Sequence, residues 1–124
     1  MIVAALIGAL SVALGAFAAH GLRNILPAEA VSVFETGVRY QFYHGLALLA
    51  VAMLYEKFPG GVMRWSGYCF QIGILLFSGS LYLMTALRAT DAVGIKKLGL
   101  LTPIGGLFFI VGWMLMLIAF IRKE

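Results

Sequence analysis

Residues 98–121 read LGLLTPIGGLFFIVGWMLMLIAFI and carry no charged side chain. A helix of about 20 mainly apolar residues spans the hydrocarbon core of a bilayer, which is about 30 Å thick. Residues 1–19 and 65–87 form two more uncharged runs of sufficient length, and residues 40–55 form a fourth, shorter run. The charged residues that flank the fourth run can reach the headgroups through their flexible stems. We therefore predict an all-α membrane protein, a four-transmembrane-helix bundle.

The composition of the whole chain supports a membrane environment. Of its 124 residues, 63% are hydrophobic and 11% are charged, whereas a soluble domain has about 45–50% apolar and about 25% charged residues. A chain of this length is expected to form one domain, residues 1–124. The net charge of +4 comes from basic residues scattered at the ends of the apolar runs, a pattern typical of contact with lipid headgroups. Membrane lipids are thus the expected partners and nucleic acid is not, because no basic stripe with interleaved aromatic residues is present.

The first apolar run has a competing interpretation as a cleaved signal peptide. The sequence Ala16-Phe17-Ala18 would pass as a cleavage site. However, no basic residues precede the run, and the run is long for the apolar region of a signal peptide. We expect a retained transmembrane helix.

Residues 27–36, before the second span, have an amphipathic pattern at helical spacing. Pro27 suits the first turn of a helix. The apolar face, which extends beyond this segment, consists of Pro27, Ala30, Val31, Phe34 and Val38. The polar face consists of Glu29, Ser32, Glu35 and Arg39. This pattern predicts a short interfacial amphipathic helix between helices 1 and 2, lying in the membrane surface. Gly37 is expected to mark the bend into the second span.

The connections between the spans divide the chain between two membrane faces. Those between spans 1 and 2 and between spans 3 and 4 share one face, which we call face B. Both ends of the chain and the connection between spans 2 and 3 share the other, face A. Face B has five basic residues, namely Arg23, Arg39, Arg88, Lys96 and Lys97. Face A has four, namely Lys57, Arg64, Arg122 and Lys123. This difference leaves the orientation open, because the positive-inside rule needs a clear excess.

Small residues recur along the spans and predict close contacts between helices. Lipid tails remove the hydrophobic driving force between helices, so close packing of small side chains replaces it. The expected contact positions are Ala4, Gly8, Ser11, Gly15 and Ala19 in the first span, Gly73, Ser78 and Gly79 in the third, and Gly105, Gly106 and Gly112 in the fourth. The single cysteine, Cys69, is expected to be a small packing residue.

The polar residues of the spans gather toward face B. A polar group in hydrocarbon must find a partner or line a wet cavity, and it is a candidate for function. We predict a polar vestibule that opens to face B, formed by nine candidate ligand-binding residues. They are His20, Glu35, Arg39, Gln41, His44, Ser78, Ser80, Tyr82 and Thr102.

Several of these residues also have a purely structural interpretation. The serines can bond to carbonyls one turn earlier, the tyrosine can belong to an aromatic belt, and His20 can satisfy carbonyls at the end of helix 1. His44 lies about 7 Å inside the membrane if its span begins at Tyr40. At that depth a histidine needs a specific partner, such as Gln41, a serine or the tyrosine. The alternatives for His44 are proton transfer and metal ligation.

Neither a cofactor nor a catalytic activity is predicted. His20 and His44 on facing helices are a formal pair of haem ligands, but their expected heights differ. A metal site needs more than two ligands, and only Glu35 is a conceivable third. No phosphate loop, G-x-S-x-G or H-E-x-x-H motif is present, and Ser80 with His44 is the only conceivable catalytic dyad. We expect a non-enzymatic protein without a cofactor or metal.

Five short strings carry a resemblance to a known family. They are GAFAAHGL at 15–22, RYQFYHGLAL at 39–48, LFSGSLY at 76–82, TPIGG at 102–106 and Gly112-Trp113. In this order they resemble a small four-helix membrane family of unknown function, domain of unknown function 423, and the match covers nearly the whole chain. That family is widespread in bacteria and includes an uncharacterised mammalian transmembrane protein. Ala18 departs from its pattern, in which glycine is commoner at this position. The resemblance implies a multi-pass protein of the bacterial inner (plasma) membrane and brings no established activity.

Three functional hypotheses follow from these observations. The first is a non-enzymatic accessory subunit or a bundle that binds a small ligand or lipid, as part of a larger membrane complex or a homo-oligomer. The second is a small oligomeric transporter or channel, suggested by the vestibule. The third is a quinone- or haem-linked redox protein that uses His20, His44 and Tyr82.

Overall fold

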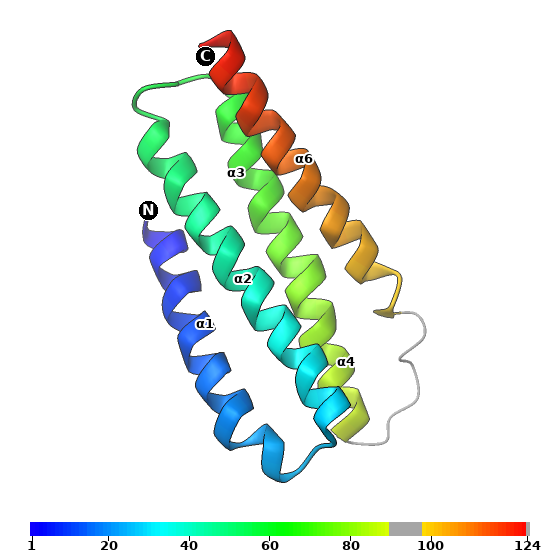
Figure 1. The fold of residues 1–124 in the computed structure, drawn as a ribbon. Helices are drawn as coiled ribbons and strands as arrows, with labels where there is room; N and C mark the ends of the chain where they lie inside the picture. The colour runs from blue at the N-terminus through cyan, green and yellow to red at the C-terminus, as the bar shows by residue number, and fades with distance from the viewer. Residues whose placement is uncertain (90–97, 124) are drawn as a thin grey trace.

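Four antiparallel helical rods make up the computed structural model, which describes residues 1–89 and 98–123 (Figure 1). The first rod is α1, Ile2–His20, followed by the short 3-10 helix η1, Leu22–Asn24. The second is α2, Ala28–Leu54. The third joins α3 (Gly61–Gly73), the π-helix η2 (Ile74–Ser78) and α4 (Gly79–Ala89), and the fourth is α6, Leu101–Arg122. The predicted all-α bundle is confirmed.

Three of the rods are long and apolar enough to cross a membrane, namely Ile2–Asn24, Gly61–Ala89 and Leu101–Arg122. The second rod, α2, is richer in polar residues. It has 27 residues, and is therefore about 40 Å long. It packs along both α1 and the third rod, so it crosses the membrane with them. A helix of this length exceeds the hydrocarbon thickness, and its first turns reach the headgroup region of face B.

The predicted interfacial helix at residues 27–36 is wrong as a separate element. The segment forms the first turns of α2, which continues without a bend through Gly37. Its apolar face is not covered by lipid. Val31 and Phe34 are instead buried in a cluster with Ala18 and Leu22, and Tyr82 packs against that cluster. Because protein rather than membrane surface covers this face, the segment stands in the bundle instead of lying flat.

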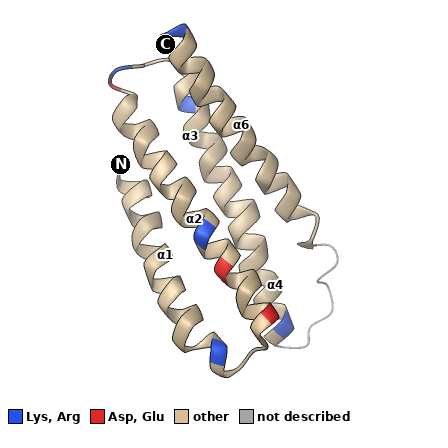
Figure 2. Ribbon diagram, in the orientation of Figure 1, with Lys and Arg blue, Asp and Glu red and all other residues tan. Residues whose placement is uncertain are grey.

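The ends of the rods lie at the two faces as predicted. The two ends of the chain and the α2–α3 turn lie at face A, and the link from α1 to α2 lies at face B (Figure 1). Charged residues gather at both ends of the bundle and also part-way along α2 (Figure 2). Lys96 and Lys97, which were counted for face B, lie outside the described residues.

Glycines permit the closest helix contacts, above all between the third rod and α6. A Cβ atom at Gly105 would collide with the backbone nitrogen of Phe77, and one at Gly73 would collide with the ring of Phe109. A Cβ atom at Gly112 would lie 2.7 Å from the ring of Phe70. These contacts confirm the predicted packing roles of Gly73, Gly105 and Gly112.

Other predicted contact glycines do not lie at contacts. A Cβ atom at Gly8 or Gly79 would meet nothing within 4 Å, and one at Gly106 would only touch the ring of Phe77 at 3.9 Å. The contact between α1 and α2 involves the predicted Gly15, where a Cβ atom would lie 3.6 Å from Val38, and also Gly45, where a Cβ atom would lie 2.8 Å from Ile7. Regular spacing of small residues therefore located the right helices but not each contact.

Candidate functional site

His44 is the most constrained polar residue of the bundle. Its Nδ1 lies 2.8 Å from the carbonyl oxygen of Tyr40, one turn earlier on α2. A carbonyl only accepts hydrogen bonds, so Nδ1 carries the proton. The other ring nitrogen, Nε2, accepts a hydrogen bond from Nε1 of Trp113 on α6 at 3.3 Å. The imidazole is therefore neutral, with both nitrogens paired.

An aromatic wall holds the imidazole of His44 in place. Its ring stacks on the ring of Phe109, with 3.5 Å between the centroids and 6° between the planes. Phe70 and Trp113 pack against it at centroid distances of 5.7 Å and 6.3 Å. His44 thus joins α2 to α6 through one hydrogen bond and one ring stack.

His44 lies in the second half of α2, which begins at Ala28 rather than at Tyr40. His44 lies about 24 Å from Ala28 along the helix axis, and about 15 Å from Leu54 at the other end. The neighbouring Gly45 contacts Ile7 of α1, which lies about 20 Å along the axis from His20. The two histidines are therefore far apart in height, and the arrangement does not suit axial ligation of one haem iron by both.

Gln41 and Tyr82 form a second interhelical link. The hydroxyl of Tyr82 on α4 donates to Oε1 of Gln41 on α2 at 2.9 Å. The amide nitrogen Nε2 of Gln41 donates in turn to the carbonyl oxygen of Ile7 on α1 at 3.4 Å. This chain of bonds connects three rods through the middle of the bundle, and Tyr82 points inward rather than joining an aromatic belt.

The two serines and Thr102 make the third set of links. Ser78 donates across the interface to the carbonyl oxygen of Gly37 on α2 at 2.7 Å, rather than to its own helix. Ser80 bonds to the carbonyl oxygen of Phe77 at 2.8 Å, and its hydroxyl lies 2.6 Å from that of Thr102 on α6. All three are thus paired within the protein.

The remaining predicted residues lie apart from these links. Glu35 forms an ion pair with Arg23 at 3.1 Å near face B. Arg39 is exposed on α2, and it lines a shallow pocket against Ser11 of α1. His20 is exposed at the end of α1. Of the nine predicted residues, Glu35, Arg39 and His44 line three different pockets.

A pocket of about 430 Å³ lies beside His44, between α2, η2 and α6. Its lining is mainly aromatic and apolar: Tyr40, His44, Phe77, Pro103, Gly106, Leu107, Phe109, Ile110 and Trp113. It extends about 15 Å along α6, from Pro103 near face B to Trp113 in mid-bundle. Phe77 belongs to the π-helix, a local distortion that is frequent at functional sites.

Sequence reasoning missed Trp113 and Phe109 as partners of His44. A signal was present for Trp113, because tryptophan is enriched at membrane interfaces whereas this one lies near the centre of α6. A central tryptophan indicates a specific partner for its N–H group. No comparable signal marks Phe109, since phenylalanine is common anywhere in a span.

The described parts of the chain offer little for a metal ion. Within residues 1–89 and 98–123, no three histidine, cysteine, aspartate or glutamate side chains come together as a group of metal ligands. In the same ranges, no fully buried side-chain nitrogen or oxygen lacks a hydrogen-bond partner. The polar residues therefore act together as ties between the helices.

Comparisons with known proteins agree on one family. A family profile described as a protein of unknown function, DUF423, matches residues 14–106. UPF0382 membrane protein YwdK of Bacillus subtilis is 40% identical over 123 residues, which are 98% of this chain and 95% of that protein. A UPF0382 membrane protein of Haemophilus influenzae is 48% identical over 109 residues, 88% of this chain and 82% of the relative. UPF0382 inner membrane protein YgdD of Escherichia coli is 37% identical over 124 residues, which are 100% of this chain and 90% of that protein. No solved structure matches.

Proposed function

The chain belongs to the DUF423 family of multi-pass membrane proteins of unknown function, and we propose that it is a non-enzymatic bundle that binds an apolar lipid molecule beside His44. The ligand enters sideways from the bilayer and lies along α6 in the face-B half of the membrane. The pocket beside His44 is the observation that carries this proposal.

The shape and chemistry of the pocket favour an apolar ligand. Its volume of about 430 Å³ lies within the range of about 300–1,000 Å³ that is typical of small-molecule sites. Rings from Tyr40, Phe77, Phe109 and Trp113 supply most of the wall, and Gly106 leaves space between them. Stacked rings around a small residue suit a flat ring or a branched hydrocarbon chain.

The hydrogen bonds of His44 favour binding over catalysis. A general base must hold a free nitrogen within reach of its substrate, and both nitrogens of His44 are paired. The conceivable dyad with Ser80 has no geometric support, since the Ser80 hydroxyl bonds to Phe77 and Thr102. A redox role would require His44 to give up one of its two partners. A transport role has no comparable observation in its favour.

The proposal is tested by filling the pocket without disturbing the fold. A Cβ atom at Gly106 meets only ordinary contact with Phe77, so Gly106→Leu is expected to fold and to occupy the pocket. Wild type and variant are purified from native membranes under identical mild conditions, and the lipids retained are quantified by liquid chromatography and mass spectrometry. We expect wild type to retain about one molecule of a particular lipid per chain and Gly106→Leu to lose most of it.

The matched control is Gly8→Leu on α1, where a Cβ atom meets nothing within 4 Å and which does not line the pocket. This variant is expected to retain the lipid at the wild-type level. An identical lipid content in wild type and Gly106→Leu would refute the proposal, as would a wild-type protein that retains only the bulk lipid mixture.

A further inference from the structure

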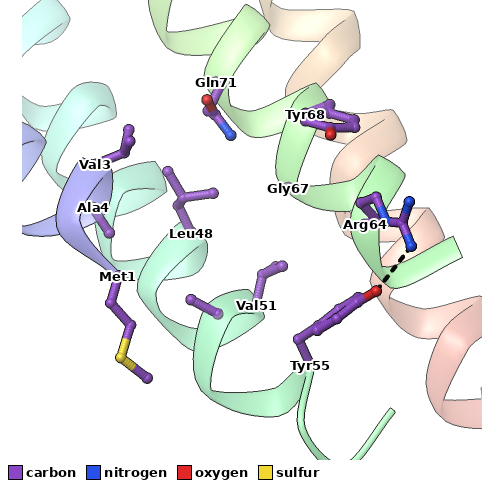
Figure 3. A pocket seen from close by; sticks show the side chains of 11 residues that line it. Met1, Val3, Ala4, Leu48, Val51, Tyr55, Arg64, Gly67, Tyr68 and Gln71 are labelled. Atoms are coloured by element: carbon purple, nitrogen blue, oxygen red, sulfur yellow. Dashed lines mark hydrogen bonds between the residues drawn. The ribbon is translucent and has the colours of Figure 1, made fainter. Parts of the chain in front are cut away.

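A second groove of about 430 Å³ opens on the other side of α2, toward face A. Its walls come from α1, α2 and α3 (Figure 3). The lining residues are Met1, Val3 and Ala4 at the start of α1, Leu48, Val51, Ala52 and Tyr55 at the end of α2, and Arg64, Gly67, Tyr68 and Gln71 on α3. This groove shares no lining residue with the pocket beside His44. It is therefore a separate feature.

The packing of α1 explains why the groove exists. In the described part of the chain, α1 packs extensively against α2 but makes no comparable contact with α3. The two helices thus stand on either side of α2 with a furrow between them. Small residues keep the furrow deep, namely Ala4, Ala52 and Gly67. An open furrow in a membrane protein is filled by lipid chains, because it lies in the hydrocarbon region.

The outer end of the groove carries a positive charge. Arg64 has the only charged side chain among the described residues that line it, and this side chain is exposed. It lies in the first turn of α3, close to the headgroup level of face A. Its Nη2 donates to the hydroxyl of Tyr55 at 3.0 Å (Figure 3). The guanidinium makes no other hydrogen bond within residues 1–89 and 98–123, so its remaining donors can meet a ligand. A guanidinium in this position suits a phosphate group.

Deeper in the groove lies the amide of Gln71. Gln71 is half-buried, and its side chain makes no hydrogen bond to any residue within 1–89 and 98–123. A free amide is costly at hydrocarbon depth. Gln71 follows Arg64 by two helical turns, so both side chains lie on the same face of α3, about 10 Å apart along the axis. Helical side chains tilt toward the N-terminus, which directs the amide back toward Arg64.

The guanidinium of Arg64 and the amide of Gln71 match the phosphate and the ester carbonyl of a glycerophospholipid. We propose that the groove binds one anionic glycerophospholipid of the face-A leaflet, with its phosphate on Arg64 and an ester carbonyl on Gln71. One acyl chain lies along Leu48 and Gly67 at the base of the groove. The positive charge of Arg64 selects a lipid with net negative charge, because no carboxylate side chain among the described residues of the groove opposes it.

The test is native mass spectrometry of the purified full chain titrated with phosphatidylglycerol or phosphatidylcholine, which differ in net charge. Wild type is expected to bind one phosphatidylglycerol about tenfold more tightly than phosphatidylcholine. Arg64→Gln is expected to remove this preference, and Arg64→Lys to keep part of it because the charge remains. Gln71→Leu is expected to weaken both lipids alike, since the ester carbonyl is common to them.

Two further variants control for general effects of charge and shape. Arg122→Gln removes one positive charge from the same face outside the groove and is expected to keep the wild-type preference. Ala52→Phe fills the groove and is expected to bind neither lipid there, and circular dichroism checks that every variant keeps its helical content. The proposal is overturned if wild type binds both lipids equally or if Arg64→Gln behaves like Arg122→Gln. It is also overturned if inorganic phosphate displaces the lipid, or if a second copy of the chain fills the groove as a dimer that Ala52→Phe dissociates.

Discussion

At the scale of single residues, several buried polar groups of this bundle have a defined partner on another helix, whereas Ser11 and Thr85 bond to carbonyls of their own helix. His44 pairs with Trp113, Tyr82 with Gln41, and Ser78 with the carbonyl of Gly37. In hydrocarbon, such bonds replace the hydrophobic effect as a source of specificity between helices. They fix which helix faces which, although each contributes only modestly to stability.

Removal of one such bond is expected to have a measurable but small effect. Tyr82→Phe deletes the hydroxyl that donates to Gln41 and leaves the ring in place. We expect the free energy of unfolding to fall by about 0.6–1.7 kcal/mol, the range of interhelical hydrogen bonds in membranes. Unfolding in mixed micelles with increasing dodecyl sulfate, followed by circular dichroism, measures the change.

Tyr43→Phe is the matched control for Tyr82→Phe. Tyr43 is exposed on α2, and its hydroxyl has no hydrogen-bond partner within residues 1–89 and 98–123. Its removal is expected to leave the free energy of unfolding within about 0.5 kcal/mol of wild type. Equal effects of the two substitutions would show that the Tyr82–Gln41 bond does not tie the helices.

The candidate residues were predictable from the sequence, but their arrangement was not. Polar side chains within apolar spans are recognisable as candidate site residues, and His44, Gln41 and Tyr82 were all predicted in this way. The vestibule inferred from them depended on the depth of each residue, and the depth of His44 depended on where α2 begins. Trp113 was needed to complete the site, and only its unusual central position in a span marked it.

At the scale of elements, the third rod and α6 form the tightest pair of the bundle. Gly105 lies directly against the backbone of Phe77, where η2 interrupts the regular helix. The next residue, Gly106, faces the open pocket beside His44. Two adjacent glycines therefore have opposite roles, one for contact between helices and one for space.

This difference predicts opposite responses to the same substitution. Gly105→Ala places a methyl group against a backbone that cannot move aside, and it is expected to lower the free energy of unfolding by about 1–3 kcal/mol. Gly106→Ala adds a methyl group in ordinary contact and is expected to be neutral or to stabilise slightly through helix propensity. The same micellar unfolding assay compares them. A larger loss for Gly106→Ala than for Gly105→Ala would contradict the packing described here.

The second rod shows where a local pattern is insufficient. The sequence correctly predicted helical, amphipathic structure in residues 27–36, but it predicted neither the continuity of this segment with the second span nor what covers its apolar face. That cover comes from α1 and Tyr82, which are distant in sequence. The other three spans could be predicted without knowing which residues pack against them, because lipid covers most of their surface.

The orientation of the first turns of α2 can be measured directly. In a Cys69→Ser background, spin labels at Glu29→Cys, Ser32→Cys and Arg39→Cys report depth by collision with a lipid-soluble relaxant. A helix that stands in the bundle places the labels at successively greater depths, with about 15 Å between positions 29 and 39. Equal depths at all three positions would support a helix that lies in the interface.

At the scale of the whole molecule, two lateral openings lie on different sides of a bundle whose helices are tied together by hydrogen bonds. The pocket beside His44 is aromatic and lies in the face-B half, whereas the groove beside Arg64 is charged and lies at face A. Both open toward lipid rather than toward each other. This arrangement favours a protein that holds lipids from the two leaflets over one that conducts a solute.

Lipid binding in the pocket beside His44 can be examined in a structure of the protein in nanodiscs of native lipid. We expect density for one apolar lipid molecule against Phe109 and Trp113, with the bond from Trp113 to His44 intact. The same density should be absent from Gly106→Leu, while the bundle is unchanged. A pocket filled by ordered water in wild type, or density that persists in Gly106→Leu, would contradict lipid binding there.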